Sequence, residues 1–184
     1  MAASTVSSIS CDELGRNFPT GSKFGDDYIK ATEFDIGSGT PALAAHGVSG
    51  KFQYVIVIPF ANNDEVEYVY KLKQDVDVRE RLYFAFDVIS AGAAKATTLT
   101  ITYDAKAPGE VTAAGATALD GTIPAKTCTT ANYLYETYYG WIEGSTLSAG
   151  DRLHITVKST SNTTADNVKL VGMSIVWHSK FRNG

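Results

Sequence analysis

The residue types that most often do chemistry in proteins are few in this sequence and widely spaced. Its three histidines are His46, His154 and His178, and no two stand at the His-x-His or His-x-x-x-His spacing of a metal centre. The two cysteines, Cys11 and Cys128, have no metal-ligand neighbour, and we expect free thiols. No Gly-x-Ser-x-Gly turn or phosphate-binding glycine loop occurs. We therefore expect no catalytic residues, no metal and no cofactor, and rank an enzyme last.

Two acidic groups could bind calcium if loops brought their oxygens together. Asp64, Glu65 and Glu67 lie in and after a turn, and Asp75 and Asp77 are two residues apart. Neither group has the Asp-x-Asp-x-Asp-Gly spacing of a dedicated calcium loop. A solvated, charged edge that blocks association between sheets is the favoured interpretation.

One stretch is unusually aromatic and could bind a ligand. Strand alternation places Tyr133, Tyr135, Tyr139 and Trp141 on a single face, where a row of exposed rings could stack on sugars. The competing interpretation puts these rings in the core or at a contact between subunits, where Tyr and Trp are enriched. Burial is favoured, because both faces of this strand have bulky residues.

Length and composition predict one ordinary globular domain. The chain has 184 residues, of which 44% are hydrophobic and 20% charged. Its net charge of -4, without a basic run, argues against nucleic acid as a partner. No apolar run has the length of a membrane helix, and the first ten residues do not resemble a signal peptide, so we expect a protein made in a cytoplasm and no membrane partner.

The hydrophobic pattern has a period of two along most of the chain and no sustained helical spacing. Eight strands with uneven and sometimes long connections favour a jelly roll over an up-and-down barrel. We predict an all-β, eight-stranded jelly-roll-like β-sandwich at 28–184, preceded by an extended N-terminal arm at 1–27. The expected strands are 28–36, 52–60, 66–73, 82–89, 97–104, 133–142, 153–158 and 168–177, with a weaker one at 111–117.

Strands 52–60, 82–89 and 168–177 are apolar on both faces, although a two-layer sandwich needs only one apolar face per strand. Either the arm and the long segment 105–132 cover the surplus, or the outer faces pack against other copies of the chain. Both interpretations remain open. Under the second, the partner-binding residues on the last strand are Val171, Met173, Ile175 and Trp177.

The last third of the chain resembles a known family. Gly150-Asp151-x-Leu153-x-Ile155-x-Val157, a polar loop and Leu170-x-Gly172-x-x-Ile175-x-Trp177 are similar to the closing hairpin of jelly-roll domains in virion proteins of tailed bacteriophages. These include capsid decoration (cement) proteins and parts of tail fibres, which are commonly homotrimers. The resemblance implies a structural protein of the virion, assembled in the host cytoplasm, without catalytic residues.

The main functional hypothesis is therefore a non-enzymatic capsid decoration protein. It would stabilise the shell as a homotrimer by binding the phage major capsid protein, and Val6, Ile9, Leu14 and Phe18 of the arm would make that contact. The alternative is a carbohydrate-binding or tail fibre/baseplate jelly-roll module that uses the aromatic face.

Overall fold

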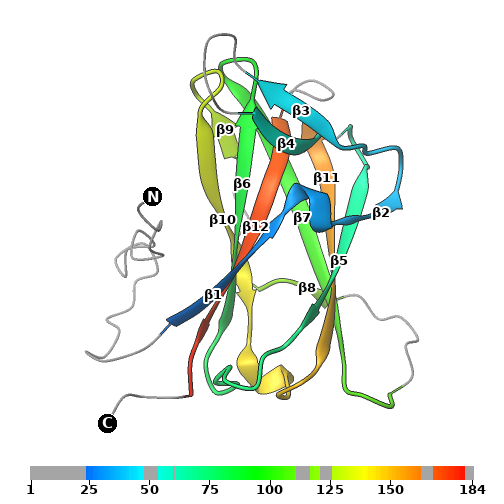
Figure 1. Cartoon of the computed structure of the whole chain (residues 1–184), viewed down its shortest axis with the longest axis vertical. Coiled ribbons are helices and arrows are strands. Elements are labelled where there is room, and N and C mark those ends of the chain that lie inside the picture. The colour runs from blue at the N-terminus through cyan, green and yellow to red at the C-terminus, as the bar shows by residue number, and fades with distance from the viewer. Residues whose placement is uncertain are drawn as a thin grey trace.

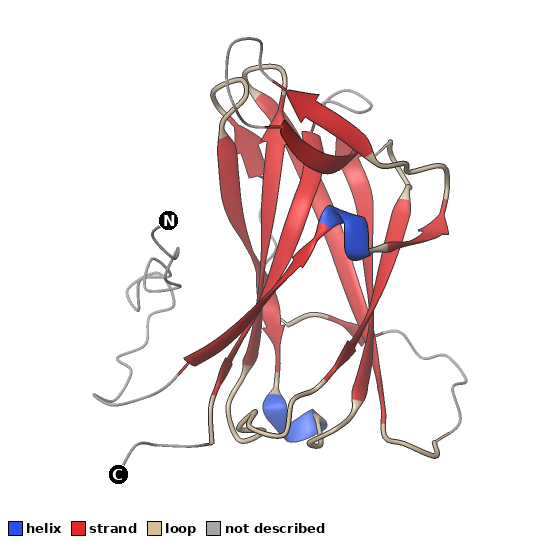
Figure 2. Cartoon of the chain, viewed as in Figure 1, coloured by secondary structure: helices blue, strands red, loops and turns tan. Residues whose placement is uncertain are grey.

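The expected strands form, and they pair into two six-stranded antiparallel sheets that face each other in the computed structural model (Figures 1 and 2). The structure describes residues 24–47, 54–59, 61–110, 117–120, 126–162 and 168–180. Two short 3₁₀ helices, η2 (Ala31–Glu33) and η3 (Gly144–Thr146), connect strands. The described residues contain no other helix, and neither of these two is long and apolar enough to cross a membrane.

Each of the two sheets has its own strand order. The first sheet has the order β10 (Leu134–Ile142), β6 (Leu82–Ser90), β12 (Val168–His178), β4 (Tyr54–Pro59) and β3 (Ala44–Gly47), and β1 (Phe24–Lys30) also pairs with β12. The second has the order β2 (Asp35–Ser38), β5 (Glu65–Lys71), β11 (Arg152–Asn162), β7 (Lys95–Lys106) and β8 (Thr117–Ala118), and β9 (Lys126–Cys128) also pairs with β7.

The predicted all-β, jelly-roll-like sandwich is confirmed, with details that the sequence did not show. The short strands β3, β8 and β9 come in addition to the eight expected ones. Strand β1 begins at Phe24, inside the segment assigned to the arm, and the expected strand 28–36 is divided by η2. The arm residues Val6, Ile9, Leu14 and Phe18, and most of the weak strand 111–117, lie outside the described residues.

The core lies between the two sheets and follows the alternation of the strands. Leu153, Ile155 and Val157 of β11 are fully buried, and they face Phe84 and Phe86 of β6 across the sandwich. Residues next to these along β11 are half-buried or exposed. On β6 the intervening residues Tyr83, Ala85 and Ile89 are buried too, as the doubly apolar pattern predicted, and Asp87 is half-buried. All three doubly apolar segments, as β4, β6 and β12, belong to the first sheet.

The proposed contact residues of the last strand need a correction. Met173, Ile175 and Trp177 of β12 are 0–2% exposed and belong to the core between the sheets, so they are not a surface. Val171 does not share their face, because a β-bulge between Leu170 and Gly172 shifts the alternation and places Val171 in a separate cluster. The structure of a single chain leaves the homotrimer as a prediction.

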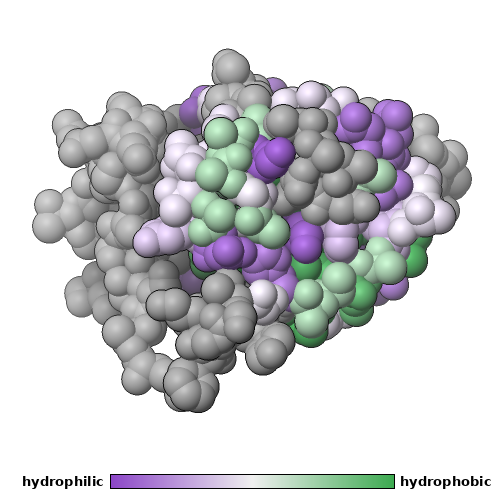
Figure 3. Space-filling view, turned by 90° about the horizontal axis from the view of Figure 1, so that it is seen from above, coloured by the Kyte–Doolittle hydropathy of each residue, from purple (hydrophilic) through white to green (hydrophobic). Residues whose placement is uncertain are grey.

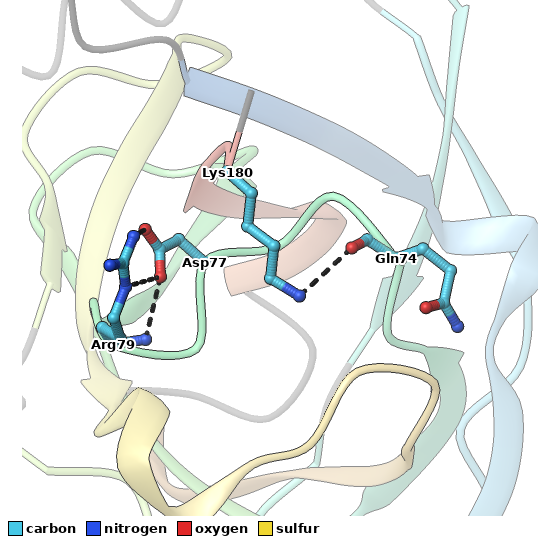
Figure 4. Close-up of polar contacts among 4 residues, drawn as sticks. All are labelled: Gln74, Asp77, Arg79 and Lys180. Atoms are coloured by element: carbon cyan, nitrogen blue, oxygen red, sulfur yellow. Dashed lines mark hydrogen bonds and ion pairs between the residues drawn. The ribbon is translucent and has the colours of Figure 1, made fainter. Parts of the chain in front are cut away.

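A polar clamp fixes the end of β12 at the lower end of the molecule. Asp77 is buried and accepts hydrogen bonds from Arg79 Nε at 2.8 Å and Arg79 Nη2 at 2.6 Å. Its backbone N–H donates to the carbonyl of His178 at 2.8 Å. Figure 4 shows Arg79 facing the Asp77 carboxylate, while Lys180 Nζ donates to the backbone carbonyl of Gln74 at 3.3 Å. The loop after β5 therefore holds the chain immediately beyond β12.

The clamp predicts acid sensitivity. Hydrogen bonds from Arg79 lower the pKa of Asp77 from 3.8 to about 2, so the stabilisation is complete above about pH 4 and is lost as the pH falls towards 2. The Arg79 side chain is 77% exposed, and solvent screens the pair. We therefore expect Asp77→Asn to lower the free energy of unfolding at neutral pH by only about 1 kcal/mol.

Urea unfolding at about pH 7, 4 and 2.5 tests this prediction, because the variant should lose less stability than the wild type over the acidic interval. Asp35→Asn, at an exposed position of β2, is the control and should behave as wild type. If the free energy of unfolding depends on pH equally in Asp77→Asn and the wild type, the clamp does not stabilise the fold.

Candidate functional site

The face of the first sheet that points away from the second sheet is the candidate site, and we call it the outer face. Because Phe84, Met173 and Ile29 point into the core, their neighbours along β6, β12 and β1 point outward. The register places these outward residues in three successive rows across the strands. From β1 to β10, the rows are Asp26, Val176, Tyr83 and Trp141; Tyr28, Ser174 and Ala85; and Lys30, Gly172, Asp87 and Glu136.

Small side chains occupy the middle of the outer face. Ala85, Gly172 and Ser174 lie on the two central strands, β6 and β12, between larger residues on either side. Short side chains at these positions leave the sheet surface low, so that a larger neighbour can lie over it. Ala85 is only 2% exposed and Gly172 is buried, so neighbouring groups already lie over this part of the sheet.

Tyr28 uses this space. A Cβ atom added to Gly172 would collide with Tyr28 Oη and lie 2.5 Å from Tyr28 Cζ, so the phenol ring reaches across β12 over the glycine. Its hydroxyl group is hydrogen-bonded to Asp87 on β6. The residue is 43% exposed. The sheet thus holds an aromatic ring against its surface and leaves part of the ring open to solvent.

Tyr28 and Asp87 are partly buried, and this burial is the main cause of their shifted pKa values. Desolvation, together with the neighbouring negative charge of Asp87, raises the pKa of Tyr28, which therefore stays a neutral hydroxyl group at physiological pH. Desolvation also raises the pKa of Asp87, while the hydrogen bond from Tyr28 opposes that change. A carboxylate accepts several hydrogen bonds, so Asp87 can accept others from a ligand's hydroxyl groups.

A second aromatic group is fixed at the other side of the outer face, on β10. Trp141 Nε1 donates a hydrogen bond to Glu143 Oε1 at 2.8 Å. Arg81 Nε donates to the same oxygen atom at 2.7 Å, and the guanidinium carbon lies 4.3 Å from the centre of the tryptophan ring. The indole is therefore held by a hydrogen bond and a cation–π contact.

The predicted row of four aromatic residues is not one face. A β-bulge between Tyr138 and Gly140 shifts the alternation of β10. Trp141 is therefore opposite Tyr83 on the outer face, whereas Tyr135 is opposite Val88 and packs beside the buried Val88 cluster. The other two lie apart from this pair: Tyr133 precedes β10 and is 63% exposed, and the side chain of Tyr139 is outside the described structure.

The bulge has a local cause. Gly140 has φ +108°, a left-handed conformation that favours glycine, and its added Cβ would collide with the carbonyl oxygen of Asp120. Asp120 and Trp141 exchange backbone hydrogen bonds of 2.9 and 3.1 Å. Asp120 can therefore approach the edge of β10 this closely only because the residue next to Trp141 is a glycine.

Sequence reasoning missed Tyr28 and Asp87 as functional candidates. They are far apart in the chain, and each is an ordinary residue of its strand. The glycine inside the last strand was the available signal, since an isolated glycine in a strand often marks a bulge or a close approach by another group. Gly172 has both properties here.

The upper end of the molecule is less well suited to a ligand. A pocket of about 290 Å³ is lined by Thr40, Ala42, Leu43, Ala44, Pro59 and Lys169, without an aromatic ring or a carboxylate. Seen from above, the described surface is a mosaic of hydrophobic and hydrophilic patches (Figure 3). Across the described ranges, no group of three or more His, Cys, Asp or Glu side chains could hold a metal ion.

Comparison with known proteins gives matches only among solved structures. No protein-family model and no curated protein matches the chain. A β-(1,4)-mannanase of Podospora anserina that contains a CBM35 module is 9% identical with a TM-score of 0.48, over 86% of this chain and 29% of the mannanase. This chain thus spans less than a third of that enzyme.

Two isolated modules are similar over nearly their whole length. The CBM22-1 xylan-binding domain of Paenibacillus barcinonensis Xyn10C is 15% identical with a TM-score of 0.47, over 84% of this chain and 94% of that domain. A carbohydrate-binding module of Cellvibrio mixtus lichenase 5A, solved with cellotriose, is 14% identical with a TM-score of 0.39, over 81% of this chain and 95% of the module.

These comparisons contradict the main functional prediction. The prediction was a capsid decoration protein, whereas the similar structures are carbohydrate-binding modules or an enzyme that contains one. The capsid decoration prediction is therefore wrong. At identities of 9–15% the likeness concerns the fold, so a ligand must be argued from the residues of this chain.

Proposed function

We propose that this protein is a non-catalytic carbohydrate-binding module that binds a glycan on the outer face of its first sheet. The observation that supports this proposal is the Tyr28 ring held over Gly172 by its hydrogen bond to Asp87. A sugar ring has an apolar C–H face and a rim of hydroxyl groups. It therefore needs a flat apolar surface next to hydrogen-bond acceptors, and this pair supplies both.

The two fixed aromatic residues suggest how a glycan lies on the face. Tyr28 is on β1 and Trp141 is on β10, three strands away in the same sheet. Three inter-strand spacings amount to about 14 Å, which is longer than a single sugar ring. A chain that crosses the strands could contact both aromatic residues, with its hydroxyl groups near Asp87 and Ser174 between them.

Replacing Tyr28 tests the proposal. We expect Tyr28→Ala to weaken binding to a recognised polysaccharide at least tenfold, or about 1.4 kcal/mol, because the stacking surface is lost. Tyr28→Phe keeps the ring and removes the hydrogen bond to Asp87, so its affinity should lie between those of the wild type and Tyr28→Ala. Calorimetric titration with soluble polysaccharides measures these affinities.

Tyr133→Ala is the matched control, because Tyr133 is exposed but lies off the outer face. Its affinity should equal that of the wild type. No binding to any polysaccharide of a broad panel would refute the proposed function. Loss of binding with Tyr133→Ala but not with Tyr28→Ala would move the site away from the outer face.

A further inference from the structure

Strand β1 forms an edge of the first sheet that has a regular backbone pattern. One side of β1 pairs with β12 along its whole length, from Phe24 opposite His178 to Lys30 opposite Gly172. The Lys30 N–H points the other way, since it donates to Glu33 Oε2 at 2.7 Å. In an antiparallel pair the backbone groups alternate in direction, so those of Asp26 and Tyr28 point to the same side as Lys30. Pairing with β12 therefore leaves these groups at the edge.

We propose that this edge pairs with the same edge of a second copy, in antiparallel register with Tyr28 opposite Tyr28. In that register Asp26 of each copy lies opposite Lys30 of the other, and all four charged side chains are on the outer face. The same residues of both copies form the contact and are related by a two-fold axis, as a symmetric dimer requires. This inference does not depend on the proposed glycan binding.

Charge disfavours two alternative registers. Centring the strand pair on Asp27 puts Asp27 opposite Asp27, and centring it on Asp26 puts Asp26 opposite Asp26, so both place like charges together. Asp27 itself is engaged within the chain, where Tyr70 Oη donates to it at 2.8 Å and Lys73 Nζ at 2.6 Å. Glu33 already accepts from the Lys30 N–H, so the ladder between copies ends at Lys30.

The pairing would join the two outer faces into one surface. Each Tyr28 ring extends away from the edge, across β12, and so stays open to a ligand in the dimer. A five-residue strand pair buries less than about 1,200 Å², the range of weak and transient contacts. We expect a concentration-dependent dimer with a dissociation constant between about 10 μM and 1 mM.

A charge swap tests the register with the full chain. Sedimentation equilibrium should show that Asp26→Lys and Lys30→Asp each raise the dissociation constant at least tenfold, because like charges then meet. The double variant Asp26→Lys/Lys30→Asp restores opposite charges and should return to within about threefold of the wild type. Both residues are exposed, so circular dichroism should show folded variants.

Lys71→Asp makes the same charge change at an exposed position of β5 and should leave the dissociation constant unchanged. A wild type that stays monomeric up to about 1 mM would overturn the inference. So would a trimer, because a two-fold strand pair closes at two copies, and so would a double variant that fails to recover.

Discussion

Replacing Met173 by aspartate is expected to unfold the domain, whereas the same replacement at the next residue, Ser174, should leave it folded. Met173 is fully buried in the core between the sheets, where a carboxylate has no partner. Burying such a charge costs several kcal/mol, a large part of the 5–15 kcal/mol by which a typical domain is stable. Ser174 is half-buried on the outer face, where a carboxylate can reach water.

Thermal unfolding followed by circular dichroism measures this difference directly. Ser174→Asp should unfold cooperatively within a few degrees of the wild type, while Met173→Asp should show no cooperative transition. A soluble, folded Met173→Asp protein of lower mass than the wild type would restore the idea that this residue contacts another subunit. Leu170, in the same core, should respond as Met173 does.

The second large effect is expected at Gly172. In Gly172→Ala the new Cβ would collide with the Tyr28 hydroxyl group and would lie 2.7 Å from the backbone oxygen of Ile29. The ring has to leave its place over the strand, and β1 has to shift. We expect glycan binding at least tenfold weaker, and a free energy of unfolding lower by about 1–3 kcal/mol.

Gly92→Ala is the matched control, because its added Cβ would meet only the flexible end of the Lys95 side chain. Calorimetric titration and urea unfolding of both variants separate the two effects. Unchanged affinity and stability in Gly172→Ala would mean that Tyr28 does not lie over this glycine. Lower stability with unchanged affinity would confirm the packing and place the glycan elsewhere.

The fold could be predicted because burial follows a period of two along most strands. Leu153, Ile155 and Val157 alternate with polar residues, and they point into the core. The same rule failed where a strand contains an extra residue. The bulges at Val171 and Tyr139 shift the pattern, so Met173 and Trp141 lie on faces other than those of Val171 and Tyr135.

The candidate site could not be predicted, because it depends on strand order and not on local pattern. Tyr28 and Asp87 meet only because β1 and β6 lie on either side of β12, and because the residue between them is a glycine. Periodicity reports which residues are buried, but it does not report which strands are neighbours. Trp141 is the one residue of the candidate site that the aromatic stretch of the sequence predicted.

The antiparallel pairing of β1 with β12 also determines how the domain responds to mechanical force. Phe24 is opposite His178, so the first residue of β1 and the last residue of β12 lie side by side at the same end of the strand pair (Figure 1). Tension between them loads the hydrogen bonds one after another, as in opening a zipper, and not all at once. The pair is therefore a soft element under tension, whereas the hydrogen bonds from the loop after β5 to His178 and Lys180 hold the end of β12 in place.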